Sequence, residues 1–175
     1  VADRWIFDTG CGKYLVGYKY AMRFKSLIKK GEAFQFNTAN GAVPANQMLP
    51  INVAEFADGD STHSAYPYLM HNSPNVLSAG LRCRKGGYSH IWLRGMTPCL
   101  ITPALRIIPL DVDGDIPYLQ TDGLHSKNLS QEEVTALTGV TIDEDGNLML
   151  DPSFLETCVC AAADEGTSPA PRAAG

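Results

Sequence analysis

The sequence has no apolar run that approaches the roughly 18 to 20 residues of a membrane-spanning helix, so we expect no membrane association. It also has no excess of positive charge. Fourteen Lys and Arg residues stand against 19 Asp and Glu residues, which gives a net charge of −5. An acidic chain is a poor match for phosphate backbones or anionic lipid, and we therefore expect no direct nucleic-acid binding.

Regularly spaced cysteine pairs are absent as well. Five cysteines are an odd number, and their scattered spacing makes a poor disulfide framework. No Cys-x-x-Cys motif occurs and no two histidines have ligand spacing, so the sequence predicts no metal site and no cofactor. We interpret the cysteines as ordinary reduced thiols of an intracellular protein. They are Cys11, Cys83, Cys99, Cys158 and Cys160.

The chain does contain enough apolar material for one folded domain and a tail. Hydrophobic residues make up 45% of its 175 residues, which suits a globular core. Sixteen Gly and 11 Pro favour a turn-rich, strand-rich protein over a helical bundle. Residues 1–4 (Val-Ala-Asp-Arg) form neither an initiator methionine nor a signal peptide, so we expect a piece of a longer protein.

Short apolar segments separated by turn residues recur along the first two thirds of the chain. Strands at intervals of about 8 to 12 residues are typical of an all-β sandwich or barrel. The strongest hairpin signal is Asn40-Gly41, because both residue types tolerate a positive φ. The run at residues 75–81 is apolar but interrupted by small residues. The predicted strands are residues 5–7, 34–36, 49–53, 66–70, 89–93, 99–102 and 105–112.

One basic cluster lies between Lys19 and Lys30, and its apolar positions follow helical spacing that Gly31 would end. We interpret this segment as a short amphipathic helix with a solvated basic face, in preference to a nucleic-acid contact. Salt-dependent binding would discriminate the two. The apolar positions are Ala21, Phe24, Leu27 and Ile28.

The pattern changes after about Leu124. Ser130 and Glu133 form a capping box that predicts a helix ending at Gly139. A small hairpin is predicted over residues 141–150, around Asp145-Gly146. From Cys160 onward Ala, Pro, Gly and Ser dominate, which is typical of a disordered tail.

Two acidic segments, residues 111–115 and 143–147, resemble calcium-binding loops in their spacing of Asp and Glu residues. An EF-hand needs Gly at position six, and Pro117 occupies position seven of the first segment, so we interpret both as turns. The four histidines are scattered, and none pairs visibly with a Ser or Cys nucleophile. A thiol protease built on Cys11 and a histidine is therefore disfavoured.

The triplet Asp8-Thr9-Gly10 directly follows the apolar residues 5–7 (Trp-Ile-Phe). Aspartic proteases need two carboxylates that share one proton and hold a water between them. The residues around each Asp must be small, and Gly lets the backbone approach the carboxylate. The triplet meets these requirements, although three such common residues also mark simple turns.

The order of motifs carries a family resemblance. Residues 5–11 (Trp-Ile-Phe-Asp-Thr-Gly-Cys) are followed by 38–41 (Thr-Ala-Asn-Gly), by 66–69 (Tyr-Pro-Tyr-Leu) and by 75–81 (Asn-Val-Leu-Ser-Ala-Gly-Leu). Together, and more loosely with 116–119 (Ile-Pro-Tyr-Leu), they resemble the retropepsin family, and within it the protease of copia-type (Ty1/copia-like) retrotransposon polyproteins. The resemblance covers roughly residues 4 to 120.

The resemblance implies a role for each matched residue. Asp8 would be the catalytic aspartate, Thr9 would lock the two active-site loops together, and Gly10 would lie against the carboxylate. Cys11 stands where the family usually has Ala or Ser, and Ser78 replaces the more usual Gly. The remaining implied residues are Ala39, Asn40 and Gly41 in a flap that closes over substrate, with its tip possible as late as Ala45-Asn46, and Val76, Leu77 and Ser78 beside the catalytic loop.

The resemblance also implies an architecture and partners. We expect an all-β, retropepsin-like closed β-barrel or sandwich with a flap hairpin over residues 1–122, a helix-hairpin extension or linker over 123–157, and a disordered tail over 158–175. One Asp-Thr-Gly cannot form the dyad alone, so the enzyme would be a homodimer that cleaves its own polyprotein, without a cofactor. We expect it in the cytoplasm or inside virus-like particles. The alternative is an inactive copy that serves as a dimerisation or scaffold module.

Overall fold

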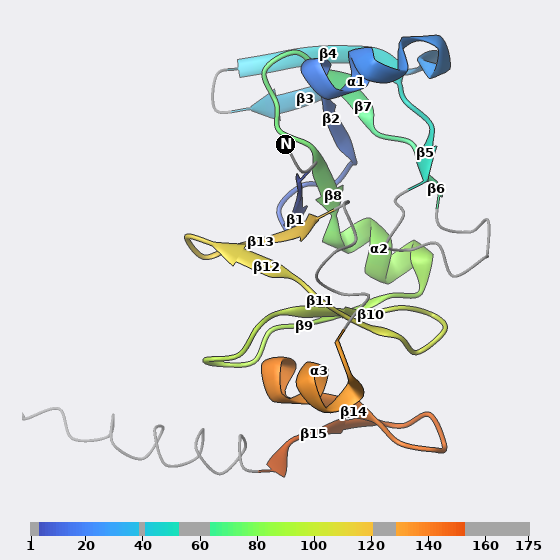
Figure 1. Cartoon of the computed structure of the whole chain (residues 1–175). Helices are drawn as coiled ribbons and strands as arrows, with labels where there is room; N and C mark the ends of the chain where they lie inside the picture. Colours follow the sequence, from blue (N-terminus) through green and yellow to red (C-terminus); the bar gives the residue numbers. More distant parts are fainter. Residues whose placement is uncertain (1–3, 39–40, 53–63, 121–128, 153–175) are drawn as a thin grey trace, which may run out of the picture.

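The protein is built mainly from short β-strands, as the sequence predicts, with few short helices (Figure 1). The computed structural model describes residues 4–38, 41–52, 64–120 and 129–152. Its largest sheet has eight strands in the order β12-β13-β1-β8-β2-β7-β4-β3. In chain order these are β1 (Arg4–Asp8), β2 (Leu15–Gly17), β3 (Lys29–Thr38), β4 (Gly41–Met48), β7 (Tyr68–Met70), β8 (Val76–Ser78), β12 (Asp111–Asp113) and β13 (Ile116–Gln120).

The eight-stranded sheet is open, so the predicted closed barrel is wrong. Its edges are β12 and β3, and no pairing joins these two strands within the part of the chain that the structure describes. The reason lies in the long β3–β4 hairpin, whose strand pairing with the rest of the sheet among the described residues is confined to Met48 and Tyr68. The hairpin therefore extends from one end of the molecule instead of curling round to close it (Figure 1).

Three central strands form a mixed arrangement in which β8 lies between β1 and β2. β8 runs parallel to β1, with Ile6 opposite Val76 and Asp8 opposite Ser78, and antiparallel to β2. A strand with neighbours on both sides and both faces covered is expected to be apolar throughout, and Val76–Ser78 is fully buried. This arrangement brings two segments about 70 residues apart side by side.

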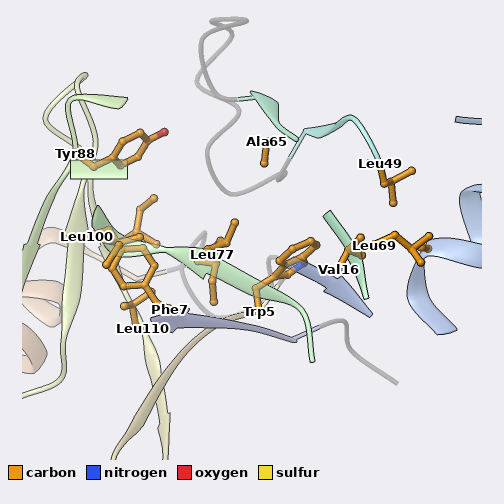
Figure 2. Close-up of a cluster of buried hydrophobic side chains, with 14 residues drawn as sticks. Trp5, Phe7, Val16, Leu49, Ala65, Leu69, Leu77, Tyr88, Leu100 and Leu110 are labelled. Carbon is orange, nitrogen blue, oxygen red and sulfur yellow. The ribbon is translucent and has the colours of Figure 1, made fainter. Parts of the chain in front are cut away.

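The main core lies against one face of β1 and β8. Trp5 and Phe7 of β1 are buried, whereas Ile6 and Asp8 between and after them are half-buried, as strand alternation requires. Because β1 ends at Asp8, the last core side chain and the candidate catalytic carboxylate are adjacent in sequence but point to opposite faces. Figure 2 shows the core as a row of side chains that includes Leu49, Leu69, Val16, Trp5, Leu77, Phe7, Leu100 and Leu110.

A second, smaller unit of structure covers the far end of this core. It comprises a three-stranded sheet in the order β11-β10-β9, on which α3 and the β14–β15 hairpin pack (Figure 1). Buried Cys99, Ile101 and Val140 form the contact between them. The bounds are β9 (Ser89–Ile91), β10 (Cys99–Ile101), β11 (Ile107–Pro109), α3 (Gln131–Thr138), β14 (Val140–Ile142) and β15 (Leu148–Leu150). A two-stranded sheet pairs β5 (Ile51–Asn52) with β6 (Ser64–Ala65).

The predicted features of this C-terminal region are confirmed where the structure describes them. Both bonds of the capping box between Ser130 and Glu133 are present, and Gly139 ends α3 in the left-handed conformation at φ 68°. The β14–β15 hairpin follows. The predicted tail from Cys160 lies outside the described residues.

The predicted basic helix is shorter than expected. A four-residue helix, α1 (Tyr18–Ala21), continues as a 3-10 helix over Met22–Leu27, and Lys29 and Lys30 already belong to β3. Phe24 has non-helical backbone angles (φ −123°), which break the regular spacing, and Leu27 is 48% exposed instead of packing inward. The predicted stop at Gly31 is therefore wrong, because the helical segment ends before it.

One helix was absent from the predictions. α2 (Ala79–Gly86) follows β8 without a gap, in the segment that the sequence presented as an interrupted apolar run. Its start and end signals are Ser78, which caps the N-terminus, and Gly87, which adopts φ 71° at the C-terminus. The predicted strand at 105–112 is likewise two strands, β11 and β12, joined at Leu110.

Both acidic segments are turns, as predicted. Asp113 pairs with Ile116 across a two-residue loop, in which Gly114 and Asp115 both have positive φ (55° and 65°). At the second, Asp143 accepts backbone hydrogen bonds from Asp145 and Asn147. Among the described residues, no group of three or more His, Cys, Asp or Glu side chains could hold a metal ion. No helix in the described part of the chain is long and apolar enough to cross a membrane.

Candidate active site

Asp8 is the last residue of β1, and its side chain is half-buried at the edge of a cavity. Strand alternation explains the position, because Trp5 and Phe7 fill the core and thereby direct Ile6 and Asp8 to the other face. The cavity has a volume of about 460 Å³, and the four consecutive residues from Ile6 to Thr9, including the buried Phe7, line it. The Asp8 backbone is held in place by β1, and its carboxylate is accessible to a molecule that enters the cavity.

The backbone of the following loop holds the Asp8 carboxylate. The Gly10 N–H donates a hydrogen bond of 2.6 Å to Oδ1 of Asp8. A Cβ atom at position 10 would lie 3.3 Å from the same oxygen, closer than side chains ordinarily approach, so a glycine fits this contact best. Gly10 therefore lies against the carboxylate, where the sequence motif puts it. Thr9 is exposed between the two.

Cys11 does not have the environment of a nucleophile. Its thiol is half-buried and donates a hydrogen bond of 3.0 Å to the backbone carbonyl of Lys13. Burial raises the pKa of Cys11, the hydrogen bond with Lys13 lowers it by a smaller amount, and the negative charge of Asp8 raises it by the smallest amount. A raised pKa keeps the thiol protonated near neutral pH, which argues against the thiol-protease alternative.

The segment Val76–Ser78 lies beside the Asp8 loop, because β8 pairs with β1 in parallel. Ser78 is 0% exposed, and its Oγ accepts a hydrogen bond of 3.2 Å from the Leu81 N–H. A serine at the N-cap satisfies one of the free N–H groups at the start of a helix, which glycine cannot do with a side chain. The serine that departs from the retropepsin pattern thus has a structural function at the start of α2.

The other wall of the Asp8 cavity comes from residues that sequence reasoning did not associate with Asp8. The β13 strand pairs with β1, with Ile6 opposite Tyr118, and so brings the tip of the β12–β13 hairpin to the cavity. His90 packs its ring 5.0 Å from the Phe7 ring, and burial lowers the pKa of His90. No local signal links these positions to Asp8, since the pairing of distant strands creates the site. The residues are His90, Trp92, Asp115, Ile116 and Pro117.

The hairpin predicted as a flap is present. Thr38 of β3 pairs with Gly41 of β4, and the Thr38 hydroxyl donates a hydrogen bond of 2.8 Å to the Gly41 carbonyl. The predicted flap residues Ala39 and Asn40 lie outside the described residues. The alternative tip at residues 45–46 is wrong, because Ala45 is inside β4 and pairs with Phe34.

Aromatic packing connects this hairpin to β7, and a cation–π contact connects it to the segment that follows the Asp8 loop. The rings of Phe34 and Phe36 lie 4.7 Å apart, and the Phe36 ring lies 5.5 Å from the Tyr68 ring of β7. The Lys13 ammonium lies 4.8 Å from the centroid of the Phe34 ring, a cation–π contact between the Asp8 loop and the hairpin. The hairpin and the loop are therefore in direct contact.

The site of one chain offers a single strand-end Asp held by a backbone N–H. Such a carboxylate can accept or donate a proton in a cavity that also has apolar walls. A pair of carboxylates sharing one proton would need a second Asp8 from another copy of the chain. Comparisons with protein-family models, with curated proteins and with solved structures found no match to this chain.

Proposed function

We propose that the protein is an aspartic endopeptidase whose active form is a homodimer with the two Asp8 carboxylates at its two-fold axis. The observation that carries the proposal is the Asp8 carboxylate at a strand end, bound by the Gly10 N–H at 2.6 Å and open to a cavity. Trp92 and Ile116 beside it are 44% and 41% exposed. Large exposed apolar side chains around a functional site favour a contact with another protein surface, here a second copy.

In the proposed mechanism the two carboxylates share one proton and hold a water between them. The ionised Asp8 takes a proton from the water as the water oxygen attacks the peptide carbonyl carbon. The protonated Asp8 of the other chain donates a hydrogen bond to the carbonyl oxygen. The C–N bond then breaks, the amine leaves with a proton, and the products are a carboxylic acid and an amine. Because the dyad must keep one proton, activity should be highest below neutral pH.

The substrate class follows from the walls around Asp8. The strand ends beside Asp8 present backbone groups that can bind an extended peptide as an added strand. None of the described residues of the β3–β4 hairpin lines the Asp8 cavity, and the hairpin contacts the segment after Asp8 through Phe34 and Lys13. Apolar side chains, including Ile6 and Trp92, favour apolar residues next to the cleaved bond. By the resemblance to copia-type proteases, the proposed substrate is the retrotransposon polyprotein from which the chain derives.

The first prediction tests the catalytic role of Asp8. We expect Asp8→Asn to abolish cleavage of a fluorogenic peptide library at pH 5, because an amide cannot act as the base or share the proton. The circular dichroism spectrum and the unfolding midpoint should stay unchanged. Glu144→Gln, which removes an exposed carboxylate on the β14–β15 turn, is the matched control and should retain full activity.

Two outcomes would contradict the proposal. Cleavage retained by Asp8→Asn would remove Asp8 from the mechanism. A wild-type dimer in sedimentation that cleaves no peptide and binds no pepstatin would instead assign the chain a dimerisation or scaffold role.

A further inference from the structure

A second cavity, of about 320 Å³, lies beside the segment that follows the Asp8 loop. Its walls come from the start of β2, from β7 and the residues before it, and from α2. The Tyr14 carbonyl accepts a hydrogen bond of 2.9 Å from the Tyr68 N–H. This bond holds the residue before β2 against the start of β7. The polar and charged residues that line it are Lys13, Tyr14, Tyr66, Tyr68, Arg82 and Lys85.

The charged side chains described around this cavity are all positive. Lys13, Arg82 and Lys85 line it, and none of the lining residues that the structure describes is Asp or Glu. Arg82 is only 2% exposed, and its guanidinium lies 5.3 Å from the centre of the Tyr14 ring and 5.4 Å from that of Tyr88. Burial lowers the pKa of Arg82, which means that its charged form is unfavourably desolvated there. A hydrogen bond with Tyr88 acts in the opposite direction and favours the charged form of Arg82. An anion in the cavity would offset the repulsion between the three cations.

The position of the cavity links it to the candidate active site. Lys13 and Tyr14 follow the Asp8-Thr9-Gly10 loop by a few residues, and the Lys13 ammonium also contacts Phe34 of the β3–β4 hairpin. Met48, at the base of the same hairpin, completes the lining. A peptide that extends from Asp8 along the segment containing Lys13 and Tyr14, towards the base of the hairpin, would therefore run past this cavity. A side chain of that peptide is the anion that the position favours.

We propose that this cavity binds the carboxylate of an Asp or Glu side chain in the peptide substrate, and so selects cleavage sites that carry an acidic residue at one fixed position. The inference rests on the proposed peptidase function. Lysine ammonium groups and tyrosine hydroxyls donate the hydrogen bonds, and the tyrosine rings cover the methylene groups of the side chain. A peptide fits better than a nucleic acid, because the whole chain carries a net charge of −5.

Binding should be measured separately from cleavage. The protein is the Asp8→Asn variant, which cannot turn over substrate, and the probes are fluorescein-labelled peptides with one Glu at successive positions, each paired with its Gln counterpart. We expect one position at which Glu binds about tenfold more tightly than Gln in fluorescence anisotropy, which corresponds to about 1.4 kcal/mol, because hydrogen bonds to a charged group are stronger than those to a neutral amide. This ratio should fall with added salt.

Lysine variants locate the effect. Lys85→Met, and Lys13→Met together with Lys85→Met, should reduce the Glu-to-Gln ratio towards one while the Gln peptide binds as before. The matched control is Lys19→Met with Lys25→Met, which removes two exposed lysines outside the cavity and should leave the ratio unchanged. Arg82 is left intact because its buried side chain packs between two rings.

The outcomes separate this inference from the peptidase proposal. Equal binding of Glu and Gln peptides at every position, or a preference that survives loss of both lysines, would overturn the acidic-side-chain site. Selective binding by Asp8→Asn, combined with no cleavage by the wild type, would keep the site and refute the peptidase. Cleavage of matched Glu and Gln peptides at equal kcat/KM would refute the site and leave the peptidase intact.

Discussion

At the scale of single residues, Asn75 determines how the strand that carries Asp8 is aligned. Its amide Oδ1 accepts a hydrogen bond of 3.0 Å from the Gly17 N–H of β2, and its Nδ2 donates one of 3.4 Å to the Arg4 carbonyl of β1. Its backbone carbonyl accepts a further bond of 2.9 Å from the Ile6 N–H. One side chain therefore connects the strands on both sides of β8. The backbones of β1 and β2 must approach Asn75 closely for these hydrogen bonds to form.

Gly17 permits this close approach, and its replacement is the residue-scale prediction. A Cβ atom at position 17 would lie 2.5 Å from the backbone carbonyl oxygen of Ser73, a distance that forces the backbone to shift. We expect Gly17→Ala to lower the free energy of unfolding by about 1 to 3 kcal/mol, as overpacking of a well-packed region does. Urea denaturation at pH 7 measures the change.

Gly12→Ala is the control for this variant, because a Cβ at position 12 would meet nothing within 4 Å. Its free energy of unfolding should differ from the wild-type value by less than about 1 kcal/mol. Equal stability of the two variants would show that the Ser73–Gly17 contact does not constrain the strands.

At the scale of elements, the hairpins and helix ends follow local rules. The two-residue loop of the β12–β13 hairpin places Gly114 and Asp115 at positive φ, which matches the right-handed twist of the flanking strands. The same hairpin lies against β1 and contributes Asp115 to the Asp8 cavity. A local turn rule thus determines the hairpin, whereas its effect on the site depends on where the hairpin packs.

The capping box of α3 gives a pH-dependent prediction. The Glu133 carboxylate accepts a hydrogen bond of 2.7 Å from the Ser130 N–H, and this bond lowers the pKa of Glu133. A carboxyl group whose pKa is lower in the folded state stabilises the fold above its unfolded pKa, about 4.3. That contribution is lost as the pH falls through the lower, folded value. Glu133→Gln should therefore be less stable than the wild type at pH 7, and the difference should shrink at about pH 3.

Thermal unfolding followed by circular dichroism at both pH values measures this change. Glu132→Gln is the matched control, because Glu132 also lies in the first turn of α3 but does not belong to the capping box. A difference between Glu133→Gln and the wild type that stays constant with pH would show that the charged form of Glu133 is not what stabilises the helix.

At the scale of the whole molecule, the chain is half of the proposed enzyme. One chain contains one Asp-Thr-Gly, and the open sheet leaves the Asp8 cavity bordered by exposed Trp92 and Ile116. Two copies related by a two-fold axis would cover these side chains and bring the two carboxylates together. In that arrangement every active dimer needs a working Asp8 in both chains.

Mixed dimers test this requirement. Wild-type and Asp8→Asn chains are mixed in equal amounts at constant total concentration, well above the dimer dissociation constant, and left to exchange. Random pairing leaves about one quarter of the dimers with two wild-type chains, so cleavage should fall to about one quarter of the wild-type rate. Wild type mixed with Glu144→Gln should keep the full rate. A fall to only one half would mean that each chain works alone.

Much of the local structure was predictable from the sequence because short-range signals determine it. Ser130, Glu133 and Gly139 mark both ends of α3, and Asn40-Gly41 marks the β3–β4 hairpin. The helix α2 was missed because its capping serine, Ser78, lies inside an apolar run that has strand character. The open sheet was missed because alternation of apolar residues indicates strands but does not indicate whether the two edge strands meet.

The sequence by itself determined that the protein is mainly β-sheet and that Asp8 ends a buried strand beside a glycine, since both depend on neighbours within a few residues. Only the tertiary structure decided what surrounds Asp8. The pairing of β1 with β8 and β13 brings Ser78 and Ile116 to it, and the docking of α2 brings Arg82 and Lys85 to Lys13. These contacts join residues far apart in the chain, and burial of the shared core selects them over other pairings.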